Sequence, residues 1–123
     1  MTPPTILLVS SADTVLSRAR RKILDHAGYR IAGAGSLGLA ISLTHSLRVN
    51  LVILEEDFSD CEKAAFIEVL HENLPGLSVL CLAHGYIQPE QLLSECRSIL
   101  SAQPGGNGAT HFLYSKVPYQ RIA

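Results

Sequence analysis

The segment Gly33-Ala34-Gly35-Ser36-Leu37-Gly38 matches the G-x-G-x-x-G pattern of dinucleotide-binding turns. In such turns, glycines bring the backbone close to a pyrophosphate, and an acidic residue about 20 positions later binds the ribose. Glu55 and Glu56 both lie near that position. Against this function, the preceding apolar segment is short and contains Arg30, and a complete strand-helix unit comes before it. The motif supports an alternative hypothesis, a small nucleotide-binding module that uses Gly33, Gly35 and Gly38.

The remaining reactive side chains form no clear catalytic or metal-binding set. The acidic residues Asp13, Glu56, Asp57 and Asp60 are better explained as helix caps and solvated loop residues than as a metal site. The three cysteines form no C-x-x-C pair, as expected of free thiols in a reducing compartment. Ser10-Ser11 has no glycine-flanked nucleophile elbow around it. The histidines lack metal-ligand spacing; they are His26, His45, His71, His84 and His111.

Short apolar segments alternate with amphipathic ones, which predicts a strand-helix alternation. Continuous apolar runs are typical of parallel strands that are buried on both faces. We predict helices that begin near Asp13, Ser36, Cys61 and Pro89, with Asp13 and Ser36 as caps. The predicted strands are Ile6–Val9, Tyr29–Ala32, Leu51–Leu54, Leu77–Leu82 and about Thr110–Tyr114.

The same periodicity predicts which helix faces are buried. The basic cluster from Arg18 to Lys22 is assigned to a solvated face of the first helix. Residues at helical spacing should instead form the inward stripe. These are Leu16, Ala19, Ile23 and Ala27 in the first helix, and Phe66, Val69 and Leu70 in the third.

Five strands alternating with four helices predict a doubly wound α/β fold with one parallel sheet. Functional groups of such sheets lie at the carboxyl ends of the strands. Composition adds further limits. The chain has 123 residues, 47% of them hydrophobic, and a formal net charge of -1, which argues against nucleic-acid binding. With no apolar run long enough to span a bilayer and no signal-peptide pattern, we expect a cytoplasmic protein without membrane contact.

Several segments resemble, in order, the response-regulator receiver domains of the chemotaxis type. ILLVSSAD resembles the first strand and its acidic turn, and HAGYRIAGAGSLGLAI is similar to the second strand and helix. NLVILEEDF resembles the strand that carries the phosphoryl acceptor, and LSVLCLAHG and HFLYSKVP resemble the last two strands. The resemblance extends from Ile6 to Pro118. It implies a flavodoxin-like fold with strand order 2-1-3-4-5 in a single domain, residues 1–123.

The resemblance also shows which chemical groups have changed. Receiver domains use two carboxylates to hold Mg²⁺, an aspartate acceptor, a Ser or Thr and a Lys. Neutral hydroxyls hold a hard dication poorly, a glutamate is one methylene longer than an aspartate, and an alanine donates no hydrogen bond. Ser115 competes with the lysine for the last position. The corresponding residues here are Ser10, Ser11, Glu55, Ala83 and Lys116.

The leading hypothesis is therefore a degenerate pseudo-receiver that is not an enzyme, needs no cofactor and has lost or weakened Mg²⁺ binding. It would act in a two-component system or phosphorelay by phosphorylation-independent contact with a protein partner. The alternatives are the nucleotide-binding module and a receiver phosphorylated at a rearranged site, on Glu55, Glu56 or Asp57.

Two structural expectations accompany this hypothesis. Glu55 either pairs with Lys116 or points into water. Receivers usually close with a fifth helix beside the first, but only residues 117–123 follow the last strand. An apolar face beneath that strand should then be buried in a homodimer or by an obligate partner, unless the loop 102–109 shields it. The interface should include Phe112, Tyr114 or Tyr119.

Overall fold

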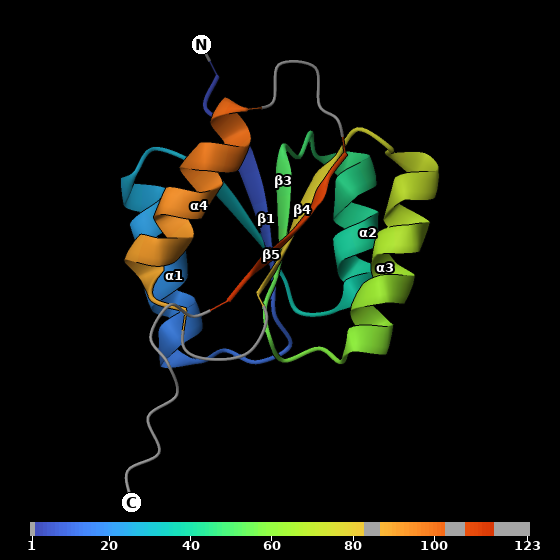
Figure 1. Ribbon diagram of the computed structural model, residues 1–123, viewed down its shortest axis with the longest axis horizontal. Helices are drawn as coiled ribbons and strands as arrows, with labels where there is room; N and C mark the ends of the chain where they lie inside the picture. Colours follow the sequence, from blue (N-terminus) through green and yellow to red (C-terminus); the bar gives the residue numbers. More distant parts are fainter. Residues whose placement is uncertain (1, 83–86, 103–107, 115–123) are drawn as a thin grey trace, which may run out of the picture.

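Parallel strands alternate with helices throughout the computed structural model, which describes residues 2–82, 87–102 and 108–114 (Figure 1). The strands are β1 (Thr5–Val9), β2 (Arg30–Ala34), β3 (Leu51–Leu54), β4 (Ser78–Leu82) and β5 (Thr110–Leu113). The helices are α1 (Val15–His26), α2 (Leu37–Ser46), α3 (Asp60–Asn73) and α4 (Pro89–Ser101). No helix in these ranges is long and apolar enough to cross a membrane.

The sheet has the order β2-β1-β3-β4-β5, and every neighbouring pair is parallel. The predicted strand order and fold class are confirmed. Side chains alternate between the two faces of the sheet, because successive residues of a strand point in opposite directions. Leu7 and Val9 of β1 pack toward α2 and α3, whereas Ile6 and Leu8 pack toward α1. Both faces of the central strands are therefore buried, as the continuous apolar runs predicted.

Helix α4 lies on the same face of the sheet as α1, while α2 and α3 cover the other face (Figure 1). The chain moves in the same direction across the sheet from β3 to β4 and from β4 to β5. Because α3 and α4 lie on opposite faces, these two crossovers have opposite hands. Crossovers between parallel strands nearly always share one hand, so the β4–α4–β5 connection is exceptional.

The position of α4 corrects one sequence-based expectation. The face of the sheet beside α1 is not left open near β5, because α4 covers it. Its apolar stripe packs against that face, and Leu113 of β5 is buried there. The α4 residues of this core are Leu92, Cys96 and Ile99.

The opposite face of β5 is the exposed one. Phe112 pairs in register with Cys81, whose side chain belongs to the core on the α2–α3 side. Phe112 therefore points to that side, and 58% of its surface is exposed. Tyr114, just after β5, is 60% exposed. Two of the three aromatic residues named from the sequence thus lie at the surface, on or next to the edge strand. The third, Tyr119, lies outside the described residues.

Local signals position several element boundaries as predicted. Ser36 caps α2 by accepting a hydrogen bond from the Leu39 amide, and Pro89 begins α4. Gly28 follows α1 with φ of 99°, a conformation that favours glycine. The predicted cap of α1 was wrong by one residue. The Thr14 hydroxyl caps the Ser17 amide, whereas Asp13 lies beside Arg18.

Two buried cations correct the predicted helix faces. Ala19 of α1 and Val69 of α3 are exposed, although both were assigned to inward stripes. Arg20 is only 1% exposed and Lys63 only 7% exposed, and each occupies the inward position instead. Both find hydrogen-bond acceptors at the carboxyl end of the sheet, which offsets the cost of removing their charge from water.

The burial of α4 and β4 predicts the reactivity of the three thiols. Cys61 is exposed, whereas Cys81 and Cys96 are buried. Burial raises the pKa of Cys81, and burial together with the charge of Glu95 raises the pKa of Cys96 to about 12. The thiolate is the reactive form, so iodoacetamide at about pH 8 should modify one thiol in the folded protein and all three in urea. Mass spectrometry counts the adducts. Modification of Cys96 as fast as that of Cys61 would contradict the position of α4.

Candidate functional site

The carboxyl ends of β1 and β3 bring Ser10, Ser11 and Glu55 to one edge of the sheet. The Ser10 amide donates to the Ala34 carbonyl, and the Glu55 amide donates to the Val9 carbonyl, so both residues extend the strand ladders. The Ser10 hydroxyl donates to the Ala12 carbonyl at 2.8 Å. These bonds hold the backbone of the site in register with the sheet.

Ser11 binds a carboxylate from the loop after β3. Its amide donates to Oδ2 of Asp57 at 2.6 Å, and its hydroxyl donates to the same oxygen. The turn after β1 therefore supplies hydrogen-bond donors to an acidic group. In the receiver domains that the sequence resembles, the same turn supplies carboxylates that hold Mg²⁺. Here the turn supplies hydrogen-bond donors instead.

Arg20 of α1 neutralises the residue at the acceptor position. Its Nη1 lies 3.1 Å from Oε1 of Glu55, and the Glu55 side chain is only 3% exposed. The same guanidinium binds both carboxylate oxygens of Glu56, at 2.6 Å and 3.0 Å. This two-pronged geometry is the strongest form of arginine–carboxylate pairing.

The guanidinium also binds the segment just before α4. Nε and Nη2 of Arg20 both donate to the Ile87 carbonyl, at 3.2 Å and 3.1 Å. A guanidinium has five N–H donors. Two of them reach Glu56, one reaches Glu55 and two reach Ile87, so all five are used. A single side chain thus connects α1, the end of β3 and the segment before α4.

The electrostatic balance of this cluster keeps Arg20 charged. Burial by itself lowers the pKa of Arg20, but the hydrogen bonds and charges of Glu56 and Glu55 outweigh it and raise that pKa above its ordinary value. The net charge of the three groups is that of one carboxylate. Since the Glu56 side chain is 32% exposed, the surplus charge lies next to solvent.

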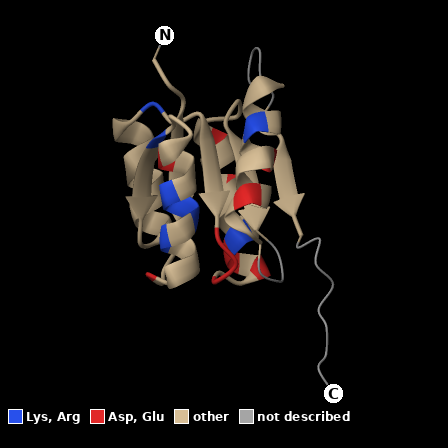
Figure 2. Ribbon diagram, turned by 90° about the vertical axis from the view of Figure 1, so that its left-hand side faces the viewer, with Lys and Arg blue, Asp and Glu red and all other residues tan. Residues whose placement is uncertain are grey.

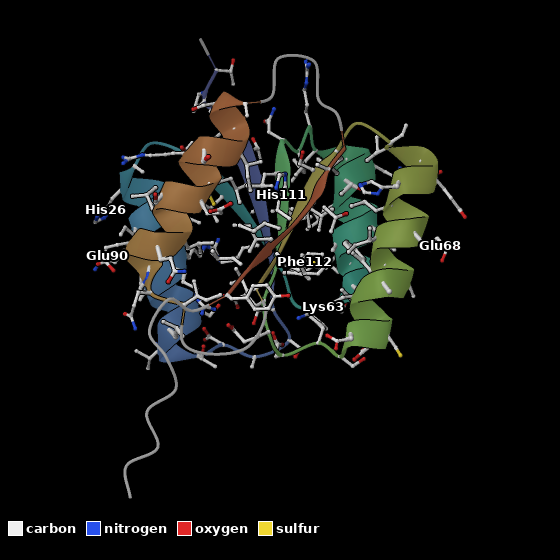
Figure 3. The ribbon with its side chains drawn as sticks, viewed as in Figure 1. His26, Lys63, Glu68, Glu90, His111 and Phe112 are labelled. Atoms are coloured by element: carbon white, nitrogen blue, oxygen red, sulfur yellow. The ribbon has the colours of Figure 1, made fainter. Side chains whose placement is uncertain are left out.

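A second cation approaches the same end of the sheet from the other face. Lys63 of α3 points toward the carboxyl ends of the strands, and its ammonium group donates to the Leu82 carbonyl at 3.1 Å (Figure 3). Leu82 is the last residue of β4. Figure 2 shows the acidic segment after β3 at this end. Buried positive charge therefore reaches the site from helices on both sides of the sheet.

These residues do not fit Mg²⁺, which needs several free oxygen ligands in octahedral geometry. The carboxylates of Glu55 and Glu56 are bound by Arg20, and Asp57 is bound by Ser11. The described part of the chain contains no group of three or more His, Cys, Asp or Glu side chains arranged for a metal ion.

Two of the five positions named from the sequence, Ala83 and Lys116, lie outside the described residues. The pairing of Glu55 with Lys116 therefore stays untested. The other expectation for Glu55, that it points into water, was wrong, because its side chain is buried against Arg20. The structure thus brings together Ser10, Ser11 and Glu55 of the predicted set.

The glycine motif lies beside this site but lacks the geometry of a dinucleotide fingerprint. Gly33 is paired within β2 rather than placed in the turn. A Cβ atom at Gly35 or Gly38 would meet no atom within 4 Å. Close packing therefore does not require glycine at either position, although such packing is the usual reason for the last glycine of the motif.

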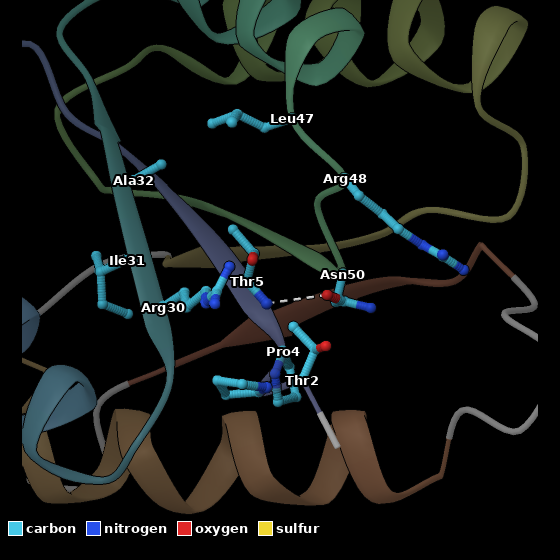
Figure 4. A pocket seen from close by; sticks show the side chains of 10 residues that line it. Thr2, Pro4, Thr5, Arg30, Ile31, Ala32, Leu47, Arg48 and Asn50 are labelled. Carbon is cyan, nitrogen blue, oxygen red and sulfur yellow. Dashed lines mark hydrogen bonds between the residues drawn. The ribbon is translucent and has the colours of Figure 1, made fainter.

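A cavity of about 590 Å³ lies at the opposite, amino-terminal end of β1 and β2 (Figure 4). Its lining includes Arg30, Arg48 and Asn50, and the Asn50 side chain accepts a hydrogen bond from the Thr5 amide at 2.9 Å. None of the residues named from the sequence as site residues lines this cavity. It is far from the cluster around Arg20, so it does not contribute to that site.

Sequence reasoning missed Arg20 and Lys63, although the sequence holds a signal for Arg20. Leu16, Arg20 and Leu24 are spaced four residues apart, which places all three on one stripe of α1. An arginine within an apolar stripe needs an acidic partner at the same depth, and the adjacent acids after β3 are available. Because Arg20 lies within a run of basic residues in α1, the whole run was assigned to the solvated face.

Comparison with known proteins identifies the fold. No protein-family model matches the chain, and no curated protein matches it. Among solved structures, a CheY-like response regulator receiver domain protein from Methanospirillum hungatei matches with a TM-score of 0.63 and 22% identity, over 94% of this chain and 83% of that chain. The chemotaxis response regulator CheY4 of Vibrio cholerae matches with a TM-score of 0.68 and 17% identity, over 80% and 99%. A signal receiver domain of an HD domain-containing protein from Pseudomonas fluorescens matches with a TM-score of 0.62 and 22% identity, over 92% of this chain and 82% of that chain. The chain has the receiver fold.

The buried cluster predicts a large stability loss when Arg20 is removed. Arg20→Met should lower the free energy of unfolding by about 3–5 kcal/mol, because it leaves the Glu55 carboxylate buried without a counter-charge. Urea unfolding measures the change. The matched control is Arg21→Met, a neighbouring exposed arginine, which should change stability by less than about 0.5 kcal/mol.

A double variant separates charge from packing in this cluster. Arg20→Met combined with Glu55→Leu should recover much of the lost stability, because no unpaired charge is then buried. Equal stability of the Arg20→Met and Arg21→Met proteins would show that the Arg20–Glu55 pair does not hold this site together.

Proposed function

We propose that this protein is a pseudo-receiver of a two-component-type signalling system that acts without phosphorylation, by binding a protein partner. The main support for this proposal is that the carboxylate at the acceptor position, Glu55, is buried and bound by the Arg20 guanidinium. The receiver fold supports the signalling role. The changed chemistry of the site supports a role that does not involve catalysis.

The charges and contacts of the acidic groups disfavour phosphoryl transfer. An acceptor carboxylate must be free to attack phosphorus, and Mg²⁺ must neutralise the phosphate oxygens. Here Arg20 supplies the positive charge from inside the protein and binds Oε1 of Glu55 and both carboxylate oxygens of Glu56. Ser11 donates two hydrogen bonds to Oδ2 of Asp57. These contacts also disfavour a rearranged acceptor among the three acids.

In this proposal the domain has one signalling state. A phosphorylated receiver switches because a new charged group biases a bistable element. Arg20 already joins the acceptor position to the Ile87 carbonyl, next to the start of α4. The internal ion pair is permanent, so it would keep α1, β3 and α4 in a fixed arrangement that a partner recognises.

The phosphorylation-independent part of the proposal has a direct test. Incubation with Mg²⁺ and acetyl phosphate should yield no mass increase of a phosphoryl group, and beryllofluoride should not raise the melting temperature. A catalytically complete receiver serves as the positive control in both assays. A phosphorylated residue mapped to Glu55, Glu56 or Asp57 would refute the proposal.

The partner surface is proposed to include the exposed aromatic residues at β5. Phe112 is 58% and Tyr114 60% exposed, and Phe112 faces the side of the sheet that α2 and α3 cover (Figure 3). Large aromatic side chains are enriched at interfaces. A homodimer through β5 is the simplest assembly, since a two-fold contact needs only one self-complementary patch.

Sedimentation tests the homodimer at micromolar concentration. The wild-type protein should sediment as a dimer, and Phe112→Asp should shift it to the monomer, because a charge in the apolar contact is costly to bury. Val15→Ser is the matched control, since Val15 is 77% exposed on α1, away from β5. A wild-type monomer, or a dimer insensitive to Phe112→Asp, would overturn the homodimer.

A further inference from the structure

A polar cavity of about 370 Å³ lies at the carboxyl ends of β1 and β2, beside α1. Its size is within the range of small-molecule sites, roughly 300–1,000 Å³. The carboxyl edge is also where open α/β sheets bind their ligands. The lining comes from the end of β1, the first turns of α1 and the end of β2. The lining includes polar, charged and glycine residues that could contact a ligand: Ser10, Ser17, Arg18, Arg21, Gly33 and Gly35.

Arg21 brings an unpaired positive charge to this cavity. No hydrogen bond or ion pair joins its guanidinium to another described residue, in contrast to Arg20, whose five donors are all used. Its position depends on Gly33. A Cβ atom at Gly33 would lie 3.1 Å from Nη1 of Arg21. The absence of a side chain at Gly33 therefore lets the guanidinium lie along the end of β2.

The rest of the lining fits an anion. Arg18 contributes a second guanidinium, and its contact with Asp13 is weak, with 3.5 Å between Nε and Oδ1 and side chains 65% and 79% exposed. The Ser17 hydroxyl has no hydrogen-bond partner among the described residues. Figure 2 shows this concentration of Lys and Arg on α1. Among the described residues of the lining, Asp13 is the only acidic one.

We propose that this cavity binds a phosphate group, either free inorganic phosphate or the phosphate of a mononucleotide. The planar guanidinium binds phosphate oxygens with two parallel hydrogen bonds, which a lysine cannot do. Arg21 and Arg18 would hold the phosphate, and the Ser17 hydroxyl would donate a further bond. The small residues Gly33 and Gly35 leave the ligand access to the backbone. The cavity shares Ser10 and Ser11 with the candidate site described above, but neither Arg20 nor Glu55 lines it.

NMR titration tests the site with three probes: inorganic phosphate, AMP and adenosine. The amide signals of Gly33, Gly35 and Ser17 should shift saturably with phosphate and with AMP, and adenosine should leave them unchanged. Tighter binding of AMP than of phosphate would identify a nucleotide as the ligand class. Equal affinities would identify free phosphate. Both results support the shared phosphate chemistry.

Three variants locate the binding groups. Arg21→Gln should weaken binding about tenfold or more, because a charged hydrogen-bonded pair is lost. Gly33→Ala should also weaken it, because the added Cβ displaces the guanidinium without removing it. Arg97→Gln is the matched control, an exposed arginine of α4 outside the cavity. Melting temperatures establish that each variant is folded.

Several outcomes would overturn the proposal. These are the absence of saturable shifts at millimolar phosphate or AMP, equal binding of adenosine, and an Arg21→Gln protein that binds as well as the Arg97→Gln control. A hexaglutamate peptide provides the remaining test. Saturable binding of that peptide at the same amides, without any binding of phosphate, would make this surface a docking site for acidic protein segments instead.

Discussion

The buried guanidinium of Arg20 is the constraint on which the carboxyl end of this fold depends. Moving a charged group out of water costs several kcal/mol even after the protein relaxes. Arg20 recovers that cost only because every one of its donors finds an acceptor, two carboxylates and one carbonyl. Glu55 and Glu56 are adjacent in the chain, whereas Ile87 belongs to a distant segment. Their positions are therefore coupled: a shift of β3, α1 or the start of α4 breaks bonds in a region that water reaches poorly.

This coupling is related to the unusual position of α4. The α4 stripe of Leu92, Cys96 and Ile99 is apolar and could cover either face of the sheet. The Ile87 carbonyl, two residues before α4 begins, is bound by Arg20 from the α1 side. That bond holds Ile87, and with it the segment before α4, on the α1 side of the sheet. The consequence is a fully covered α1–α4 face and an exposed Phe112 on the other side.

The features that could be predicted from sequence are those set by local patterns. Strands β1 and β3 were predicted because a short unbroken apolar run between turn residues is typical of a strand buried on both faces. The helix starts at Ser36 and Pro89 were predicted because these residue types are favoured there. Arg20 could not be assigned to the core in this way. Its partners Glu55 and Ile87 lie 35 and 67 positions away, so its burial is decided by tertiary contacts. The hand of the last crossover was missed for a similar reason, because the periodicity of α4 says which stripe is buried but not against which face.

In the proposed function, the fold keeps its architecture while the chemistry at the carboxyl edge of the sheet is replaced. A metal-dependent edge gathers acidic groups and then relies on a bound dication to relieve their repulsion. In this chain the acids after β3 remain, but the neutralising charge is covalently part of the protein, as Arg20, and the turn after β1 donates hydrogen bonds through Ser11. A dication is exchangeable and its binding can be linked to an external signal, whereas an arginine cannot leave. In the proposed function, an arginine in place of a dication would preserve the electrostatic balance among β1, β3 and α1, and it would leave fewer free carboxylate oxygens for phosphorylation.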